Sequence, residues 1–147
     1  MIWQKEAFSI TTDKTKFSVE YIHQYLSTQS YWAAGIPLQT VQKSVEGSLC
    51  FGVFHHSQMI GFARVITDNA TFGYLADVFI EESFRGQGLS KWLMEVIVQH
   101  PNLQGLRRFM LATHDAHGLY RQFGFTDLTF PERWMQIVNP DVYKTPA

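Results

Sequence analysis

Two glycines at alternate positions, Gly86 and Gly88, lie between an apolar stretch and the beginning of a predicted helix. Glycine lets the backbone approach a ligand closely and adopts dihedral angles that other residues avoid. At a helix start, free N–H groups and the positive end of the helix dipole point to one place. Phosphate suits such a site, and Arg85 and Lys91 add positive charge at its rim.

Two familiar phosphate loops do not fit this segment. The dinucleotide fingerprint G-x-G-x-x-G requires a third glycine where Lys91 stands. That fingerprint also belongs to the first strand–helix unit of a parallel sheet, whereas this loop follows three strand-like runs. The P-loop pattern, with Gly-Lys-Ser/Thr after four intervening residues, does not occur in the chain.

The elements that must position the loop alternate between strand and helix periodicity. Before the loop, the pattern predicts a strand at 8–12, a helix at 17–26, a short helix beginning near Pro37, and antiparallel strands at 49–54, 59–66 and 71–80. After it, the pattern predicts an amphipathic crossover helix from Leu89, a strand at 108–113, a helix at 115–123, and closing strands from Phe125 and over 134–138. This order predicts one mixed α/β domain over residues 1–147.

Bulk composition narrows the function classes. The chain has 147 residues and a formal net charge of −1, so it lacks the basic surface of a nucleic-acid-binding protein. It has neither an 18-residue apolar run nor a signal-peptide core, which predicts a cytoplasmic protein without a membrane segment. The single cysteine, Cys50, lies in an apolar run and is interpreted as a reduced core residue.

Three segments together resemble the GNAT superfamily of N-acyltransferases. Leu75-Ala76-Asp77-Val78-Phe79-Ile80 resembles the family's fourth strand, and Arg85-Gly86-Gln87-Gly88-Leu89-Ser90 resembles its pyrophosphate loop. The segment 116–125, with Tyr120 four residues before a Gly-Phe pair, resembles its later helix. Two positions depart from the pattern: Ser90 replaces glycine or alanine, and Thr113 replaces a polar residue that is commonly asparagine.

The resemblance implies a mostly antiparallel sheet whose fourth and fifth strands splay apart to admit the pantetheine arm of acetyl-CoA. The arm would pair with the backbone of Val78, Phe79 and Ile80, and the loop from Arg85 to Ser90 would hold the pyrophosphate. Tyr120 is the implied general acid that protonates the departing thiolate.

The base and the acceptor pocket are predicted less directly. Asp77 is the candidate base because alternation within its strand points it toward the substrate side. Glu81, Glu82, His114 and His117 are other titratable groups nearby, each also explained as a surface residue. For the acceptor we name five aromatic residues, for which core packing is an equal explanation: Tyr31, Trp32, Phe72, Tyr74 and Trp134.

The sequence therefore predicts an acetyl-CoA-dependent N-acetyltransferase acting on a primary amine of a small molecule, with no metal. Two alternatives stay open: a non-catalytic module that senses acetyl-CoA or CoA, and an enzyme that acetylates a protein or peptide amine. Six histidines without paired ligand spacing give no indication of a metal site. A homodimer is a further expectation, with the late strands between 125 and 138 as its contact.

Overall fold

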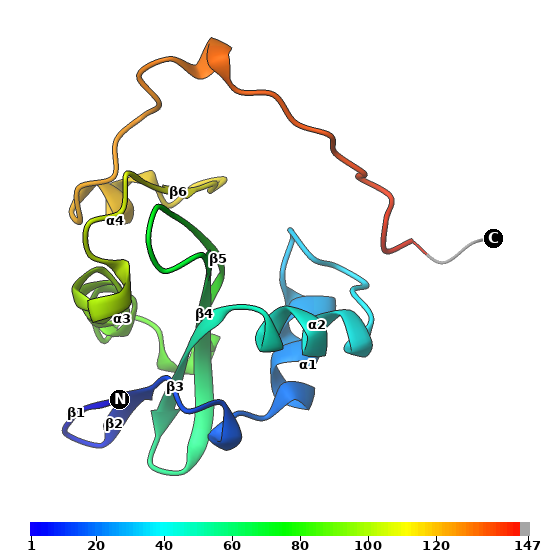
Figure 1. Cartoon of the computed structure of the whole chain (residues 1–147). Coiled ribbons are helices and arrows are strands. Elements are labelled where there is room, and N and C mark those ends of the chain that lie inside the picture. Colours follow the sequence, from blue (N-terminus) through cyan, green and yellow to red (C-terminus); the bar gives the residue numbers. More distant parts are fainter. Residues whose placement is uncertain (145–147) are drawn as a thin grey trace.

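The computed structural model describes residues 1–144 and is built on one six-stranded sheet, in which the strands follow one another in chain order (Figure 1). The strands are β1 Ile2–Lys5, β2 Phe8–Thr11, β3 Leu49–His55, β4 Gln58–Thr67, β5 Phe72–Ile80 and β6 Arg108–Leu111. All neighbouring pairs are antiparallel except β5 and β6, which are parallel. The predicted mixed sheet is thus confirmed.

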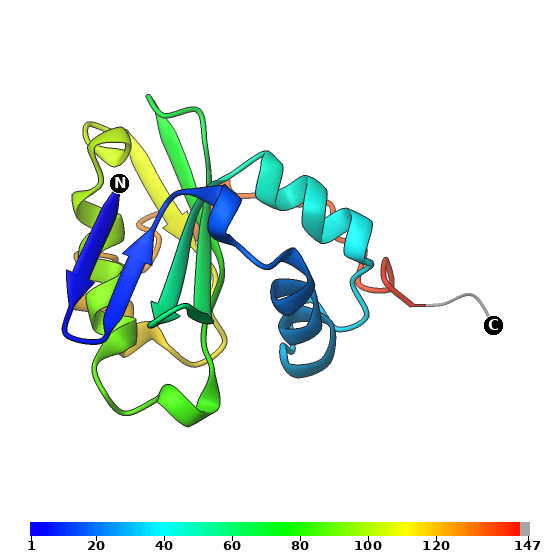
Figure 2. The ribbon, with the colours of Figure 1, turned by 90° about the horizontal axis from the view of Figure 1, so that it is seen from below.

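Helices cover both faces of the sheet (Figure 2). One face is covered by α1 Val19–Gln29 and α2 Leu38–Glu46, and the other by the crossover helix α3 Leu89–Gln99, with α4 His117–Arg121 following β6. Each face has its own core: Leu93, Met94 and Ile97 pack on one side, and Ile22, Leu26 and Val41 on the other. No helix within residues 1–144 is long and apolar enough to cross a membrane.

The sequence pattern gives the order of the elements but misplaces some of them. β1 was not predicted, α1 begins two residues later than expected and extends to Gln29, and β6 ends at Leu111. The prediction of closing strands from Phe125 and over 134–138 is wrong for this structure. Residues 126–142 instead run as an exposed arm, interrupted by a single 3-10 turn at Pro131–Arg133. The arm arches away from β6 and returns toward α1 and α2 (Figure 1).

Candidate active site

The centre of the candidate site is the point where β5 and β6 part. Their ladder pairs Phe72–Leu75 with Arg108–Leu111, and β5 then continues to Ile80 paired only with β4. Next to the end of this ladder the β4–β5 register shifts, so that Asp77 and Val78 together oppose a single residue of β4. Asp77 has a φ of 55°, in the left-handed region that aspartate tolerates better than most residues. The bulge and the short ladder together free one edge of β5 along the predicted cofactor residues Val78 to Ile80.

The glycine loop joins β5 to α3 through a 3-10 turn at Glu82–Phe84. Gly86 and Gly88 both have a φ of 80°, which explains why these positions require glycine. A Cβ atom at either position would meet no protein atom within 4 Å, so the space beside both residues is open. Gly88 is the N-cap of α3, and no side chain caps the helix. Its first N–H groups are therefore available to an external anion.

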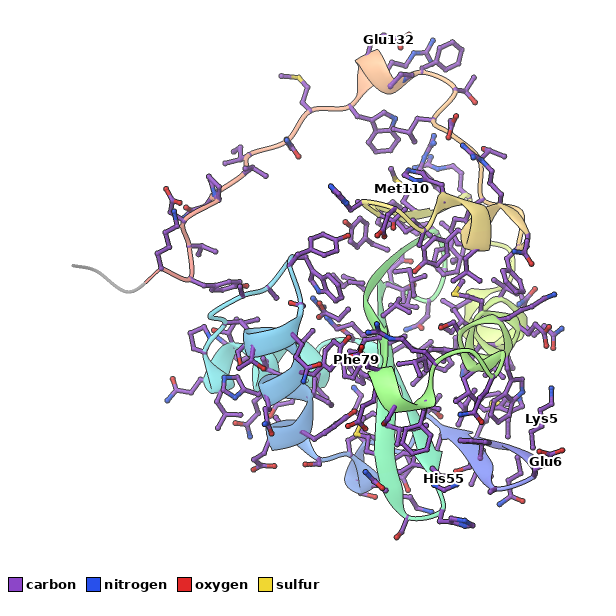
Figure 3. The ribbon with its side chains drawn as sticks, turned by 180° about the vertical axis from the view of Figure 1, so that it is seen from behind. Lys5, Glu6, His55, Phe79, Met110 and Glu132 are labelled. Atoms are coloured by element: carbon purple, nitrogen blue, oxygen red, sulfur yellow. The ribbon has the colours of Figure 1, made fainter. Side chains whose placement is uncertain are left out.

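Arg85 is tied to the sheet and to α1. Its Nε donates to the carbonyl oxygen of Ile80 at 3.0 Å, and its NH2 donates to the Tyr25 hydroxyl at 2.8 Å. The Tyr25 ring in turn stacks on Phe79 with ring centroids 3.8 Å apart. Figure 3 shows Phe79 on the ribbon of β5 beside α1. Arg85 thus anchors the glycine loop to the sheet and to α1. Its remaining N–H groups can donate hydrogen bonds to a phosphate.

A small cavity of about 80 Å³ adjoins the loop. Gln87, Gly88 and Leu89 line one side, and the β1–β2 hairpin lines the other with Lys5 and Glu6, both labelled in Figure 3. Lys5 is a cation beside the loop that sequence reasoning missed. Because β1 was not predicted as a strand, no local signal placed Lys5 near residue 88.

Asp77 belongs to a polar cluster on the α1–α2 side of the sheet. Its carboxylate accepts from Arg64 Nε at 2.6 Å and from Trp32 Nε1 at 2.8 Å. The Arg64 NH1 also donates to the Ser48 hydroxyl at 3.1 Å. The Asp77 side chain is only 8% exposed, so the charge on Arg64 compensates a carboxylate that is largely removed from water. Arg64 was not predicted as a site residue from the sequence. Its position as the one charged residue within the apolar run 59–66 was a signal that could have identified it.

Tyr31 and Trp32 connect the two separated strands. Trp32 reaches β5 through Asp77, while the Tyr31 hydroxyl accepts from the backbone N–H of His114, beyond β6, at 3.0 Å. The Tyr31 and Trp32 rings meet edge to face with centroids 5.0 Å apart. Two of the predicted acceptor residues therefore lie together beside Asp77.

Of the other three predicted acceptor residues, Phe72 and Trp134 lie at the opposite end of the β5–β6 ladder, and Tyr74 lies nearer the point where the strands part. Phe72 pairs with Arg108, Tyr74 pairs with Met110, and the Arg108 guanidinium lies 4.7 Å from the centroid of the Trp134 ring. Arg108 thus joins Phe72 to Trp134. The five aromatic residues form two groups, with Tyr74 between them along the strand.

Tyr120 lies in α4 and is 9% exposed. It lines a cavity of about 780 Å³ together with the end of β6, Thr113 and His117. Burial raises the pKa of the Tyr120 phenol, with a smaller contribution from Tyr31. A phenol with a raised pKa keeps its proton at neutral pH and can donate it.

Metal-ligating groups do not gather in this part of the molecule. Among residues 1–144, no group of three or more His, Cys, Asp or Glu side chains could hold a metal ion. The titratable candidates that sequence reasoning named are dispersed: Glu81 accepts from the Tyr21 hydroxyl at 3.4 Å, and the backbone of His114 contacts Tyr31.

Comparisons with known proteins agree with this geometry. The model of the acetyltransferase (GNAT) family matches residues 14–125, so the chain belongs to that family. A candidate acetyltransferase of this family from Xanthomonas campestris has a crystal structure that is 48% identical, with a TM-score of 0.92; the match covers 94% of this chain and 97% of that one.

Two further relatives are more distant. A Gibberella zeae protein named as a candidate acetyltransferase is 30% identical, over 85% of this chain and 82% of its own length. A Clostridium acetobutylicum protein, described as a predicted acetyltransferase in complex with acetyl-CoA, has a TM-score of 0.63 at 13% identity, covering 94% of this chain and 96% of that one. The last comparison supports the fold alone. The chain is an acetyl-CoA-dependent N-acetyltransferase by family membership.

Proposed function

We propose that this chain transfers an acetyl group from acetyl-CoA to a primary amine of a small molecule, with Tyr120 as general acid and Asp77 as general base. The observation that carries the proposal is the parting of β5 and β6. It leaves an unpaired edge of β5 that leads from the glycine loop to Asp77, while Tyr120 lines a cavity with the residues that end β6.

The donor side fits a pyrophosphate and a peptide-like arm. Open space and positive φ at Gly86 and Gly88, together with the uncapped start of α3, support anion binding by residues Arg85 to Ser90. The backbone of Val78, Phe79 and Ile80 offers hydrogen-bonding groups to an arm that runs along β5. When bound there, acetyl-CoA supplies the thioester carbonyl that the amine attacks.

Asp77 accepts the proton that the attacking amine loses. Each of its oxygen atoms already accepts one hydrogen bond, from Arg64 or from Trp32, and each keeps a further lone pair. Arg64 and Trp32 hold the carboxylate in one orientation, and its remaining lone pairs can receive a proton directly or through one water molecule.

Tyr120 donates a proton to the thiolate that leaves as the C–S bond breaks and the new C–N bond forms. The proton removed from nitrogen goes to Asp77, and the proton given to sulfur comes from the Tyr120 phenol, so the two transfers balance. The raised pKa of Tyr120 keeps the acid form present at neutral pH.

A compact acceptor fits the pair Tyr31 and Trp32, whose rings lie next to Asp77 and the end of β6. Phe72, Tyr74 and Trp134 would extend this aromatic wall along the strand for a longer acceptor. Aromatic side chains present large contact areas at low entropic cost, which suits an amine with an apolar or aromatic body.

The test is CoA thiol release by the wild-type chain across a panel of aromatic, aliphatic and peptide amines, with acetyl-CoA thermal shift in parallel. The proposal expects stabilisation by acetyl-CoA and turnover that is greatest on a small amine. Stabilisation without turnover on any amine would instead support the sensing module. Turnover confined to peptides would support acetylation of a protein amine.

A further inference from the structure

Arg85, the arginine of the glycine loop, is held by neutral acceptors. Its two hydrogen bonds go to the carbonyl oxygen of Ile80 and to the hydroxyl of Tyr25, and it forms no ion pair within the part of the chain that the structure describes. Arg64, by contrast, pairs with the Asp77 carboxylate. A carboxylate would offset the positive charge that attracts a phosphate, whereas a carbonyl and a phenol leave that charge in place.

The Arg85 guanidinium is fixed on one side and free on the other. Nε and NH2 are bonded at 3.0 and 2.8 Å, while NH1 makes no hydrogen bond to the described residues and the side chain is exposed. A guanidinium is planar and presents its N–H groups as a rigid fork, so two bonded nitrogen atoms fix the direction of the third. Arg85 therefore holds free donors in one orientation, in a loop with open space beside Gly86 and Gly88.

Tyr25 is a fixed point for this contact because it is part of the core. It is only 6% exposed and lies on the buried face of α1 with Ile22 and Leu26. Its ring stacks on Phe79 of β5, with centroids 3.8 Å apart and an angle of 7° between the rings. Close packing leaves such a ring one position, so its hydroxyl is a stationary acceptor for an exposed side chain.

Holding an arginine before its ligand arrives affects affinity. A long side chain loses rotamer freedom when it binds a phosphate, and this loss opposes binding. A contact that already orders the side chain in the free protein removes part of that cost. The hydrogen bond between Tyr25 and Arg85 is such a contact, so its effect should be seen in the binding of a phosphate-bearing ligand.

We propose that Tyr25 is a positioning residue for acetyl-CoA, whose hydroxyl holds the Arg85 guanidinium in the orientation that binds the pyrophosphate. The inference rests on the proposed function, in which the loop from Arg85 to Ser90 holds that group. Tyr25 takes no part in the chemical step and acts through Arg85 alone.

Tyr21 offers a matched control, one turn earlier on the same helix. Its ring also lies beside Phe79, with centroids 6.0 Å apart, and its hydroxyl donates to the Glu81 carboxylate at 3.4 Å. Both tyrosines therefore link α1 to residues at the end of β5, but only Tyr25 contacts the arginine. A change to phenylalanine removes one hydroxyl at either position and keeps the ring.

The first test is the dissociation constant of acetyl-CoA from the full chain, measured by isothermal titration calorimetry without an acceptor amine. We expect Tyr25→Phe to bind acetyl-CoA about 10-fold more weakly than the wild type, and Tyr21→Phe to bind it as tightly as the wild type. Because Arg85 is exposed, its NH2 group returns to water in Tyr25→Phe. The melting temperature of the free protein should therefore stay close to that of the wild type.

A double-mutant cycle separates positioning from a purely structural role. Arg85→Met should weaken acetyl-CoA binding at least as much as Tyr25→Phe does, and adding Tyr25→Phe to Arg85→Met should cause no further loss. A Tyr25→Phe variant that binds as tightly as the wild type overturns the proposal, as does an equal loss in both backgrounds. A wild type that does not bind acetyl-CoA, or an Arg85→Met variant that binds it normally, would contradict the loop assignment itself and the positioning role with it.

Discussion

The Arg64 guanidinium donates to the Asp77 carboxylate over 2.6 Å, across the register shift between β4 and β5. Both side chains are largely buried, and Trp32 and Ser48 occupy further hydrogen-bonding positions of the pair. The ion pair and its two hydrogen-bond partners therefore join four segments of the chain at the point where the two strands of the site separate.

Arg64→Met leaves the Asp77 carboxylate buried without its cation. Removing one partner of a buried ion pair costs about 3–5 kcal/mol, so we expect a loss of about 3 kcal/mol in the urea-derived free energy of unfolding. Arg121→Met is the matched control, because its ion pair with Asp127 is exposed and is worth at most about 1 kcal/mol. Equal losses for the two variants would contradict the assignment.

Tyr120→Phe removes the proposed acid while keeping the ring in the core. We expect kcat to fall by about 100-fold, with the KM for acetyl-CoA unchanged and the melting temperature close to wild type. Because burial raises the pKa of Tyr120, its protonated form persists as pH rises through 10, the ordinary phenol value. Any loss of the wild-type kcat that comes from deprotonation of this group should therefore occur at a higher pH than it would for an ordinary phenol. Tyr21→Phe, which removes a hydroxyl bound to Glu81, is the control and should retain full kcat.

Gly88→Ala tests the backbone requirement of the loop. At a φ of 80°, alanine costs about 1–2 kcal/mol, and the loop can relieve that strain only by leaving the conformation that presents its N–H groups. We expect the thermal shift produced by acetyl-CoA to shrink or vanish. Gly118→Ala, at a helical position in α4 that also has open space, should instead raise stability by about 0.5–1 kcal/mol and keep the shift. A full acetyl-CoA shift in Gly88→Ala would refute the loop assignment.

Cys50 should be unreactive in the folded chain. Burial raises the pKa of its thiol to about 11, so almost no thiolate exists at pH 8, and the sulfur is covered. A disulfide reagent that detects thiolate should label nothing in the native protein at pH 8 and one thiol per chain after unfolding in guanidinium. Because the folded pKa is raised, the stability linked to this group is complete below its ordinary pKa and is lost as pH rises through about 11. Rapid native labelling would show that the thiol is accessible.

Much of the fold could be predicted from the sequence, because the periodicity of apolar residues in a helix or strand is a local property. The spacing of Leu89, Leu93 and Ile97 predicts α3, and the hairpin at residues 55–58 predicts the pairing of β3 with β4. The family was recognisable because its motifs are also short and contiguous. By contrast, Trp32 and Asp77 are 45 positions apart, and the left-handed φ of Asp77 leaves no mark on the sequence pattern.

Residues 134–138 also show that a local sequence pattern does not determine tertiary structure. Their composition favours a strand, but the structure has none here, because a strand forms only where it can pair with a free strand edge. In this structure Trp134 contacts Arg108, Tyr143 packs on the α1–α2 side, and residues 134–138 pair with no strand within residues 1–144. Those contacts are tertiary and could not be predicted from the pattern.

The short ladder between β5 and β6 also sets an order of unfolding. β1 to β5 form a chain of antiparallel neighbours, whereas β6 joins them through four residue pairs after the long crossover of residues 81–107. Elements that depend on few, distant contacts open first, so amide protons of β6 and α4 should exchange with solvent faster than those of β3 and β4. Tyr120 thus lies in a part of the molecule that should be less protected than β3 and β4, and a ligand that spans β5 and β6 would slow exchange there.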